Sequence, residues 1–292
     1  MFFCIIIEGR SSTSGSYFLL KSSIFLGRTV KLKYKVIFLL AMFAQTGHSQ
    51  ILVGPVIGGN YSFTSFDNKS LSNAYNVGGV FGYHIGGHLS FKVRKRFFLH
   101  TSLIYSTKGR TLDSDEFEDF KYKAQYNFVE LPIAYTVDFK SKLGNSREFK
   151  YFLGLGPNIS YWLSGKGTLT DSYLLENNIN ELPFKFAFKE RSEQPPKEEM
   201  LVERPNRLQF GLNFVGGIVF EPAPRQRVML TLRYELGHTF MAKSDGELES
   251  SYFRDPLQSR NQGFRVSLAY LYDLKTEERN RGRSTIDRRN PK

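Results

Sequence analysis

Eight stretches of this sequence alternate large apolar side chains with small or polar ones. Side chains of a β-strand point to opposite faces with a period of two, so each stretch has one apolar face and one polar face. In the third stretch, Leu99, Leu103 and Tyr105 share one face, whereas His100 and Ser106 share the other. The stretches are Ile51–Phe63, Val77–Val93, Phe97–Lys108, Val129–Phe139, Tyr151–Leu163, Leu208–Phe220, Val228–Leu236 and Phe264–Leu274.

The apolar faces predict strands that cross a lipid bilayer. A membrane-spanning strand needs about 9–11 residues at a steep tilt, and each stretch reaches that length. An open sheet edge is not tolerated in hydrocarbon, and single-chain bacterial barrels have an even number of strands. Eight strands enclose a space just wide enough for side chains to fill. The sequence therefore predicts an all-β fold, an eight-stranded antiparallel transmembrane up-and-down β-barrel with a filled polar interior, over residues 50–275.

The connections between the stretches alternate in length, as they do in outer-membrane barrels. Three of them are short and basic: Arg94–Arg96, Lys140–Arg147 and Glu221–Arg227. Four others are long and polar: Thr64–Tyr75, Gly109–Ala124, Ser164–Pro205 and Ala242–Asn261. This layout predicts periplasmic turns, outer loops and both ends of the barrel on the periplasmic side. Within the longest loop, Leu174–Leu182 is predicted as a short helix, because prolines interrupt the remainder.

The two ends of the chain carry targeting signals and most of the net charge. Residues 31–49 combine three lysines, a nine-residue apolar run and small residues, which predicts a signal peptide cleaved after Ser49, with a short membrane anchor as the alternative. Residues 1–30 are then either an over-long gene start or a genuine extension, and they hold the only cysteine, Cys4. Residues 276–292 are predicted to be a basic, disordered tail that is solvated, with contact to anionic lipid or periplasmic partners as the alternative. Of the net charge of +12, the first 50 residues carry +5 and the last 18 carry +4, so nucleic-acid binding is not predicted.

Charged residues of both signs lie on the faces predicted to point inward. Because an isolated buried charge is costly, these groups are expected to pair as a hydrogen-bonded plug, with a narrow ion path as the alternative. Glu130 is predicted to pair with Arg233 or Arg265. The other inward ionisable residues are Lys92, Lys108, Asp138, Glu235 and Asp273.

Histidines raise the possibility of a metal or catalytic site. His84, His88 and His100 are predicted to point inward, and His88 and His100 to be cross-strand neighbours close enough to share a divalent metal. The alternative, which we favour, is hydrogen bonding within the lumen. A lipid-hydrolysing site would need a nucleophile beside a base, and the nearest approach to that pattern is His238 near Ser244. Neither pattern has a diagnostic spacing, so no cofactor, metal or catalytic residue is predicted.

Four short segments resemble the PorT-like outer-membrane β-barrel family of Bacteroidota. They are Gly54–Ser62, Tyr105–Gly109, Tyr126–Pro132 and Gly154–Asn158, and the resemblance runs from about residue 50 to residue 275. It implies an outer-membrane location, and its namesake member is linked to protein secretion by the type IX pathway. The loop Ser164–Pro205 is an elaboration to which no family function is carried over.

Together these observations favour a non-enzymatic integral outer-membrane barrel associated with secretion or surface interaction. Its predicted partners are outer-membrane lipid and secretion or envelope proteins, and the sequence leaves its oligomeric state open. A barrel enzyme or a metal-binding barrel is the alternative. A lipocalin-like carrier is disfavoured because it would need an apolar interior and a polar outside. An open diffusion pore is disfavoured because it would need about 16 strands.

Overall fold

The computed structural model describes residues 50–114, 119–143, 147–188, 198–248, 251 and 253–274. The predicted extension 1–30, signal peptide 31–49 and tail 276–292 lie outside these residues. Within the described ranges, no helix has the length and apolar character needed to cross a membrane.

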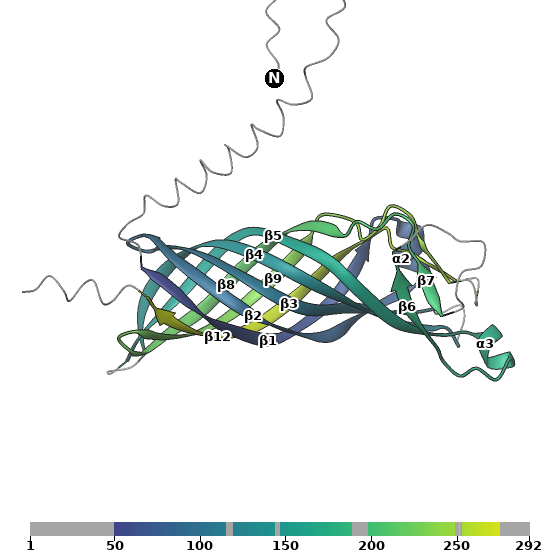
Figure 1. Cartoon of the computed structure of the whole chain (residues 1–292), viewed down its shortest axis with the longest axis horizontal. Helices are drawn as coiled ribbons and strands as arrows, with labels where there is room; N and C mark the ends of the chain where they lie inside the picture. The colour runs from purple at the N-terminus through teal and green to yellow at the C-terminus, as the bar shows by residue number, and fades with distance from the viewer. Residues whose placement is uncertain are drawn as a thin grey trace, which may run out of the picture. The chain divides into compact units, whose positions relative to one another are not determined.

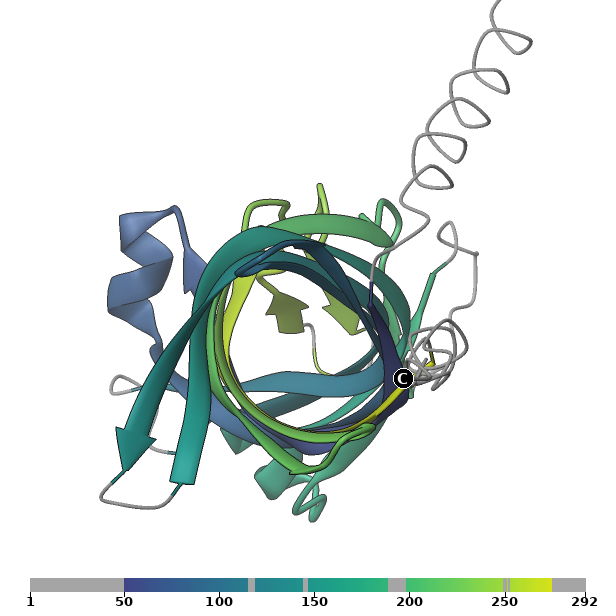
Figure 2. The ribbon, with the colours of Figure 1, turned by 90° about the vertical axis from the view of Figure 1, so that its left-hand side faces the viewer.

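Eight long strands form a closed antiparallel ring. They are β1 (Ile51–Phe66), β2 (Asn76–Arg94), β3 (Phe97–Asp113), β4 (Lys121–Leu143), β5 (Arg147–Thr170), β8 (Leu208–Ala223), β9 (Gln226–Gly237) and β12 (Ser259–Asp273). Each long strand pairs with the next, β5 pairs with β8, and β12 returns to pair with β1, which closes the ring (Figures 1 and 2). The predicted eight-stranded up-and-down barrel is confirmed.

The predicted alternation holds on the walls of the ring. Outward side chains form a belt of exposed apolar residues, such as Phe81, Leu153 and Leu232. On β4 this belt covers alternate residues from Val129 to Phe139. The side chains at the intervening positions, including Glu130, point inward and are buried. The ring is therefore apolar outside, which suits hydrocarbon, and filled inside.

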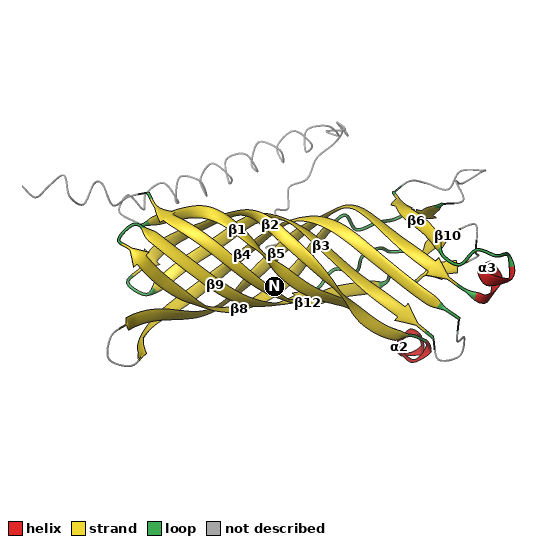
Figure 3. Cartoon of the chain, turned by 90° about the horizontal axis from the view of Figure 1, so that it is seen from below, coloured by secondary structure: helices red, strands yellow, loops and turns green. Residues whose placement is uncertain are grey.

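The strands continue well beyond the apolar belt at the end where the long loops lie. On β4 the outward residues there are polar: Lys121, Lys123, Gln125 and Asn127. The predicted loop Gly109–Ala124 is consequently mostly strand, because β3 runs to Asp113 and β4 begins at Lys121. Figure 3 shows this overhang of the yellow strands at the end that carries α2 and α3.

Short elements of the long loops gather at that end. They are α2 (Lys69–Ala74), α3 (Ser172–Glu176), β6 (Leu182–Ala187), β7 (Glu199–Leu201), β10 (Gly246–Leu248) and β11 (Phe253–Asp255). Strands β6, β7, β10 and β11 extend the sheet from the edge of β5 in that order. We call these four strands the loop sheet.

Two local predictions differ from the structure. The short helix predicted at Leu174–Leu182 is present as α3, but it spans Ser172–Glu176, because Asp171 caps it by accepting a 2.8 Å hydrogen bond from the Leu174 amide. Val77 was predicted to face outward with Phe81, but it packs against buried interior residues. A shift in the β2–β3 pairing between Gly79 and His84 accounts for this reversal, since it changes the phase of the alternation.

The interior is filled in three layers. The turn-side cluster is apolar: Leu52, Val56, Ile104, Ala134, Phe152, Val215, Val219, Met229, Ala269 and Leu271. The loop-side cluster is apolar and aromatic: Leu112, Tyr122, Ala124, Tyr126, Phe128, Trp162, Leu169, Leu174, Phe184, Phe186, Met200, Val202, Met241, Ala242, Leu248 and Leu257. The third layer consists of buried charged and polar side chains, described next.

Candidate functional site

Glu130 on β4 is the centre of a buried ion network. It is fully buried, and its carboxylate accepts from Arg265 Nη2 at 3.0 Å on both oxygens. Lys108 Nζ lies 3.0 Å from Oε1, and Ser106 Oγ also donates to that oxygen. Asn158 Nδ2 donates to Oε2 at 3.2 Å. Two cations and two neutral donors thus replace the water that this carboxylate lost on burial.

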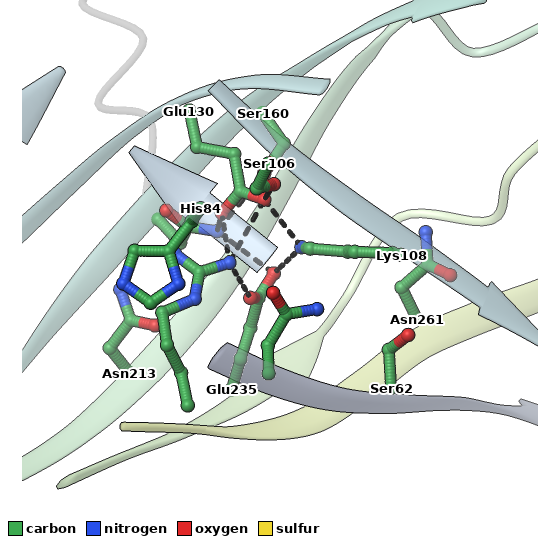
Figure 4. A network of polar contacts seen from close by, with 12 residues as sticks. Ser62, His84, Ser106, Lys108, Glu130, Ser160, Asn213, Glu235 and Asn261 are labelled. Carbon is green, nitrogen blue, oxygen red and sulfur yellow. Dashed lines mark hydrogen bonds and ion pairs between the residues drawn. The ribbon is translucent and has the colours of Figure 1, made fainter. Parts of the chain in front are cut away.

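A second carboxylate, Glu235 on β9, completes the network. Lys108 Nζ lies between the two acids and donates to Glu235 Oε1 at 2.6 Å (Figure 4). Asn158 donates to the same oxygen at 2.8 Å, and Arg265 Nη2 lies 3.7 Å from Glu235 Oε2. These residues come from β3, β4, β5, β9 and β12, so the network ties together most of the ring.

Arg233 is left out of this network. It faces Arg265 directly across the β9–β12 ladder. Within the described residues it makes no hydrogen bond or ion pair, although it is only 7% exposed. Of the two partners predicted for Glu130, Arg265 is therefore confirmed and Arg233 is not in contact. The sequence could not decide between them, because the choice depends on side-chain paths across the lumen.

The three inward histidines are buried and hydrogen-bonded to serines. Ser90 Oγ lies 2.9 Å from His88 Nε2 and 2.6 Å from His100 Nδ1, so it bridges the two rings. The ring centroids are 5.5 Å apart, which confirms that these histidines are neighbours. Among the described residues, no three His, Cys, Asp or Glu side chains converge in the way a metal site requires.

His84 lies further along the lumen and depends on a glycine. Its Nε2 is 2.8 Å from Ser267 Oγ on β12. Gly58 on β1 is its direct partner across the β1–β2 ladder. A Cβ at Gly58 would lie 2.6 Å from the His84 ring and 2.0 Å from the Val266 carbonyl oxygen. Glycine is needed here because the neighbouring backbone and the ring approach so closely.

A small cavity lies beside the ion network. Its volume is about 20 Å³, enough for one water molecule or a small ion. Its polar lining includes His84, His88, His100, Arg233 and Arg265. Its apolar lining belongs to the turn-side cluster. The cavity is therefore a junction between the polar layer and the apolar layer.

A further buried ion pair, which the sequence analysis missed, joins the loop sheet to the barrel wall. Arg110 Nη2 on β3 donates to Asp255 Oδ1 on β11, and Tyr122 Oη donates to Asp255 Oδ2. Arg110 also donates to Ser259 Oγ at 2.8 Å. Continuing the inward alternation of the third stretch from Lys108 to Arg110 would have identified this arginine. Nothing local identifies Asp255, which is 145 residues away.

The charge of Asp255 acts on neighbouring loop residues. Burial, followed by the charge of Asp255, raises the pKa of Asp245 and the pKa of Tyr75. Both groups lie in loops outside the apolar belt. Asp255 is therefore close enough to influence two loop residues besides its direct partners Arg110 and Tyr122.

The remaining candidates lie toward the ends of the barrel. Asp273 is buried and accepts from the Gln50 side-chain amide. Lys92 and Asp138 are half-buried near the turns. His238 is exposed, and no hydrogen bond joins it to Ser244 within the described part of the chain. The pairing that a hydrolytic site would need is therefore not formed between these two residues.

The family described as "Outer membrane protein beta-barrel domain" matches residues 43–239, about two thirds of the chain. The chain belongs to this family. The apolar belt is accordingly the surface that meets lipid, and the protein is an outer-membrane β-barrel protein.

Several solved outer-membrane proteins are similar to this barrel protein at low sequence identity. The attachment invasion locus protein Ail of Yersinia pestis is 10% identical, with 76% of this chain and 98% of that chain covered and a TM-score of 0.32. OprG from Pseudomonas aeruginosa is 11% identical, with 77% and 93% covered and a TM-score of 0.36. Neisserial surface protein A is 10% identical, with 75% and 95% covered and a TM-score of 0.31. No curated protein matches the sequence.

Proposed function

We propose that this protein is a non-enzymatic, PorT-like barrel that serves as a closed membrane scaffold for secretion-associated or surface interactions. The observation that carries the proposal is the blocked interior. The turn-side cluster, the ion network and the loop-side cluster follow one another along the lumen, and each consists of buried side chains. A filled eight-stranded barrel is suited to hold and present its loops rather than to conduct solutes.

The loop end offers a built surface for such a role. Trp162 packs edge-on against Tyr126, with ring centroids 5.4 Å apart, and against Phe186 at 5.6 Å. The Arg110–Asp255 ion pair fixes β11 to the wall beneath. At the far tip, Tyr173 of α3 is 54% exposed. Rigid support below and an exposed aromatic side chain above are features of a protein-binding surface.

The closed state is tested by electrical recording. Full-length protein reconstituted into planar bilayers is expected to give no stepwise conductance above that of the lipid alone. A variant carrying Phe152→Ala and Met229→Ala, which shortens two side chains of the turn-side cluster, controls for successful insertion because it should raise leakage. Stepwise conductance of the unaltered protein would contradict the proposal and favour the narrow ion path.

The interaction role is tested by photo-crosslinking in the native envelope. A photoreactive amino acid in place of Tyr173 is expected to capture a defined secretion or envelope protein, whereas one in place of Leu232 on the lipid face is expected to capture none. Capture of a subunit of a secretion machinery would support the PorT-like role. Identical patterns from both positions would contradict a scaffold that acts through its loops.

A further inference from the structure

The charges of the middle layer do not balance. Lys108, Arg233 and Arg265 are three cations, whereas Glu130 and Glu235 are two carboxylates, and all five residues are at most 8% exposed. The carboxylates are already held by Lys108 and Arg265. An arginine keeps its charge inside proteins, so one positive charge stays uncompensated by these groups. A buried charge without a counter-charge is strongly unfavourable.

The arginines of this layer line the cavity beside the network. Both Arg233 and Arg265 line the cavity, but neither Glu130 nor Glu235 does. Its other polar lining is made of histidine, serine and threonine side chains, all of which can donate a hydrogen bond. The lining thus includes two arginines and no carboxylate residue.

Several nitrogen atoms of this wall have no hydrogen-bond partner within the described residues. They are Arg233 Nε, Arg265 Nε, Arg265 Nη1, His84 Nδ1 and His100 Nε2. Buried polar atoms in native proteins nearly always have partners, so unpartnered atoms gathered around one cavity point to something bound in it. In each of these histidines the other ring nitrogen is hydrogen-bonded to a serine: His84 Nε2 to Ser267 and His100 Nδ1 to Ser90. The unpartnered nitrogen is therefore available to a bound group.

We propose that this cavity binds one small inorganic monoanion of the halide class, held between Arg233 and Arg265. Such an ion supplies the missing negative charge and accepts hydrogen bonds from several directions at once. The apolar residues behind it, including Phe152 and Met229, lower the local dielectric and strengthen the attraction. The small volume of the cavity suits a single compact ion. A water molecule would accept hydrogen bonds from these donors but would leave the surplus positive charge uncompensated.

The test uses full-length protein refolded in detergent at one ionic strength with sodium bromide or sodium gluconate. We expect a higher thermal unfolding midpoint in bromide, by roughly 2–4 °C, because only bromide fits the cavity and stabilises the folded state by mass action. Crystals grown in bromide are expected to show an anomalous peak between the two guanidinium groups. Equal midpoints together with no anomalous peak would show that water fills the cavity and would overturn the proposal.

Two variants separate this site from general salt effects. Arg233→Met removes the surplus charge, so its midpoint is expected to be the same in bromide and gluconate, and its anomalous peak is expected to be lost. Arg254→Met, an exposed arginine of β11, should retain the bromide effect of the unaltered protein. If Arg233→Met retains the full bromide effect, the assignment is wrong. If that variant does not fold, the anomalous map of the unaltered protein still decides.

Discussion

Arg233 and Arg265 face each other directly across the β9–β12 ladder, yet only Arg265 reaches Glu130. Like charges directly opposite on neighbouring strands destabilise a sheet unless other groups compensate them. Glu130 compensates Arg265, and the cavity is where compensation for Arg233 has to come from. Two identical side chains of the polar layer thus differ in their charge partners.

Glu130 is predicted to be the most sensitive residue of the ion network. Glu130→Gln removes the negative charge that Lys108 and Arg265 share, which leaves buried cations without their partner. We expect a loss of about 3–5 kcal/mol in the free energy of unfolding, measured by urea titration of protein folded in lipid vesicles. Lys150→Ala breaks the more exposed pair with Glu221 and should cost less than about 1 kcal/mol. Equal costs for the two variants would contradict a structural role for the network.

The Arg110–Asp255 pair is predicted to hold the loop sheet on the barrel. Arg110→Met leaves Asp255 buried and unpaired, so β11 should open more often and trypsin should cleave after Arg254 at least roughly tenfold faster. Replacing both Arg110 and Asp255 with methionine should restore much of the protection, because no unpaired charge is left. Thr64→Val, which removes only a 3.3 Å hydrogen bond from Arg110, should leave the cleavage rate nearly unchanged.

The apolar belt is predicted to be intolerant of charge at its middle. Leu232→Arg on β9, where the side chain is 56% exposed, should cost about 2–4 kcal/mol of unfolding free energy in lipid. Gln125→Arg on the overhanging part of β4 should cost no more than about 1 kcal/mol, since that position lies beyond the belt. A similar cost at both positions would mean that the belt is misplaced.

Two neighbouring glycines on β1 are predicted to differ in their tolerance of substitution by alanine. Gly58→Ala forces a methyl group against the Val266 carbonyl oxygen and the His84 ring, and should cost about 1–3 kcal/mol. Gly59→Ala places its methyl group 3.8 Å from the nearest atom, on the outer face, and should be tolerated. The fraction refolded, read from the heat-dependent gel mobility typical of barrels, measures both. A tolerated Gly58→Ala would show that β1 lies further from β12 than described.

The alternation of side chains predicted the ring, its outer belt and the inward position of every charged candidate, because a period of two is a local property of a strand. The pattern has exceptions where apolar residues lie on inward faces. Phe98 and Ile104 interrupt the polar face of β3, and the structure buries both of them inside. They belong there because the turn side of the lumen is filled with apolar side chains.

Partner choice inside the barrel could not be predicted, since it depends on contacts between strands far apart in sequence. Glu130 and Arg265 are 135 residues apart, and Arg110 and Asp255 are 145 apart. Strand ends were also underestimated, because the prediction stopped where the outward residues became polar. Inward alternation continues past that point on β4 through Tyr126 and Tyr122.

The ion network also bears on the order in which the protein assembles. Arg265 is carried by β12, the same strand whose pairing with β1 closes the ring. In any state in which β12 is not in place, Glu130 has Lys108 but lacks its guanidinium partner, and its charge is only partly compensated. Closure of the ring and compensation of the Glu130 charge therefore depend on the same strand.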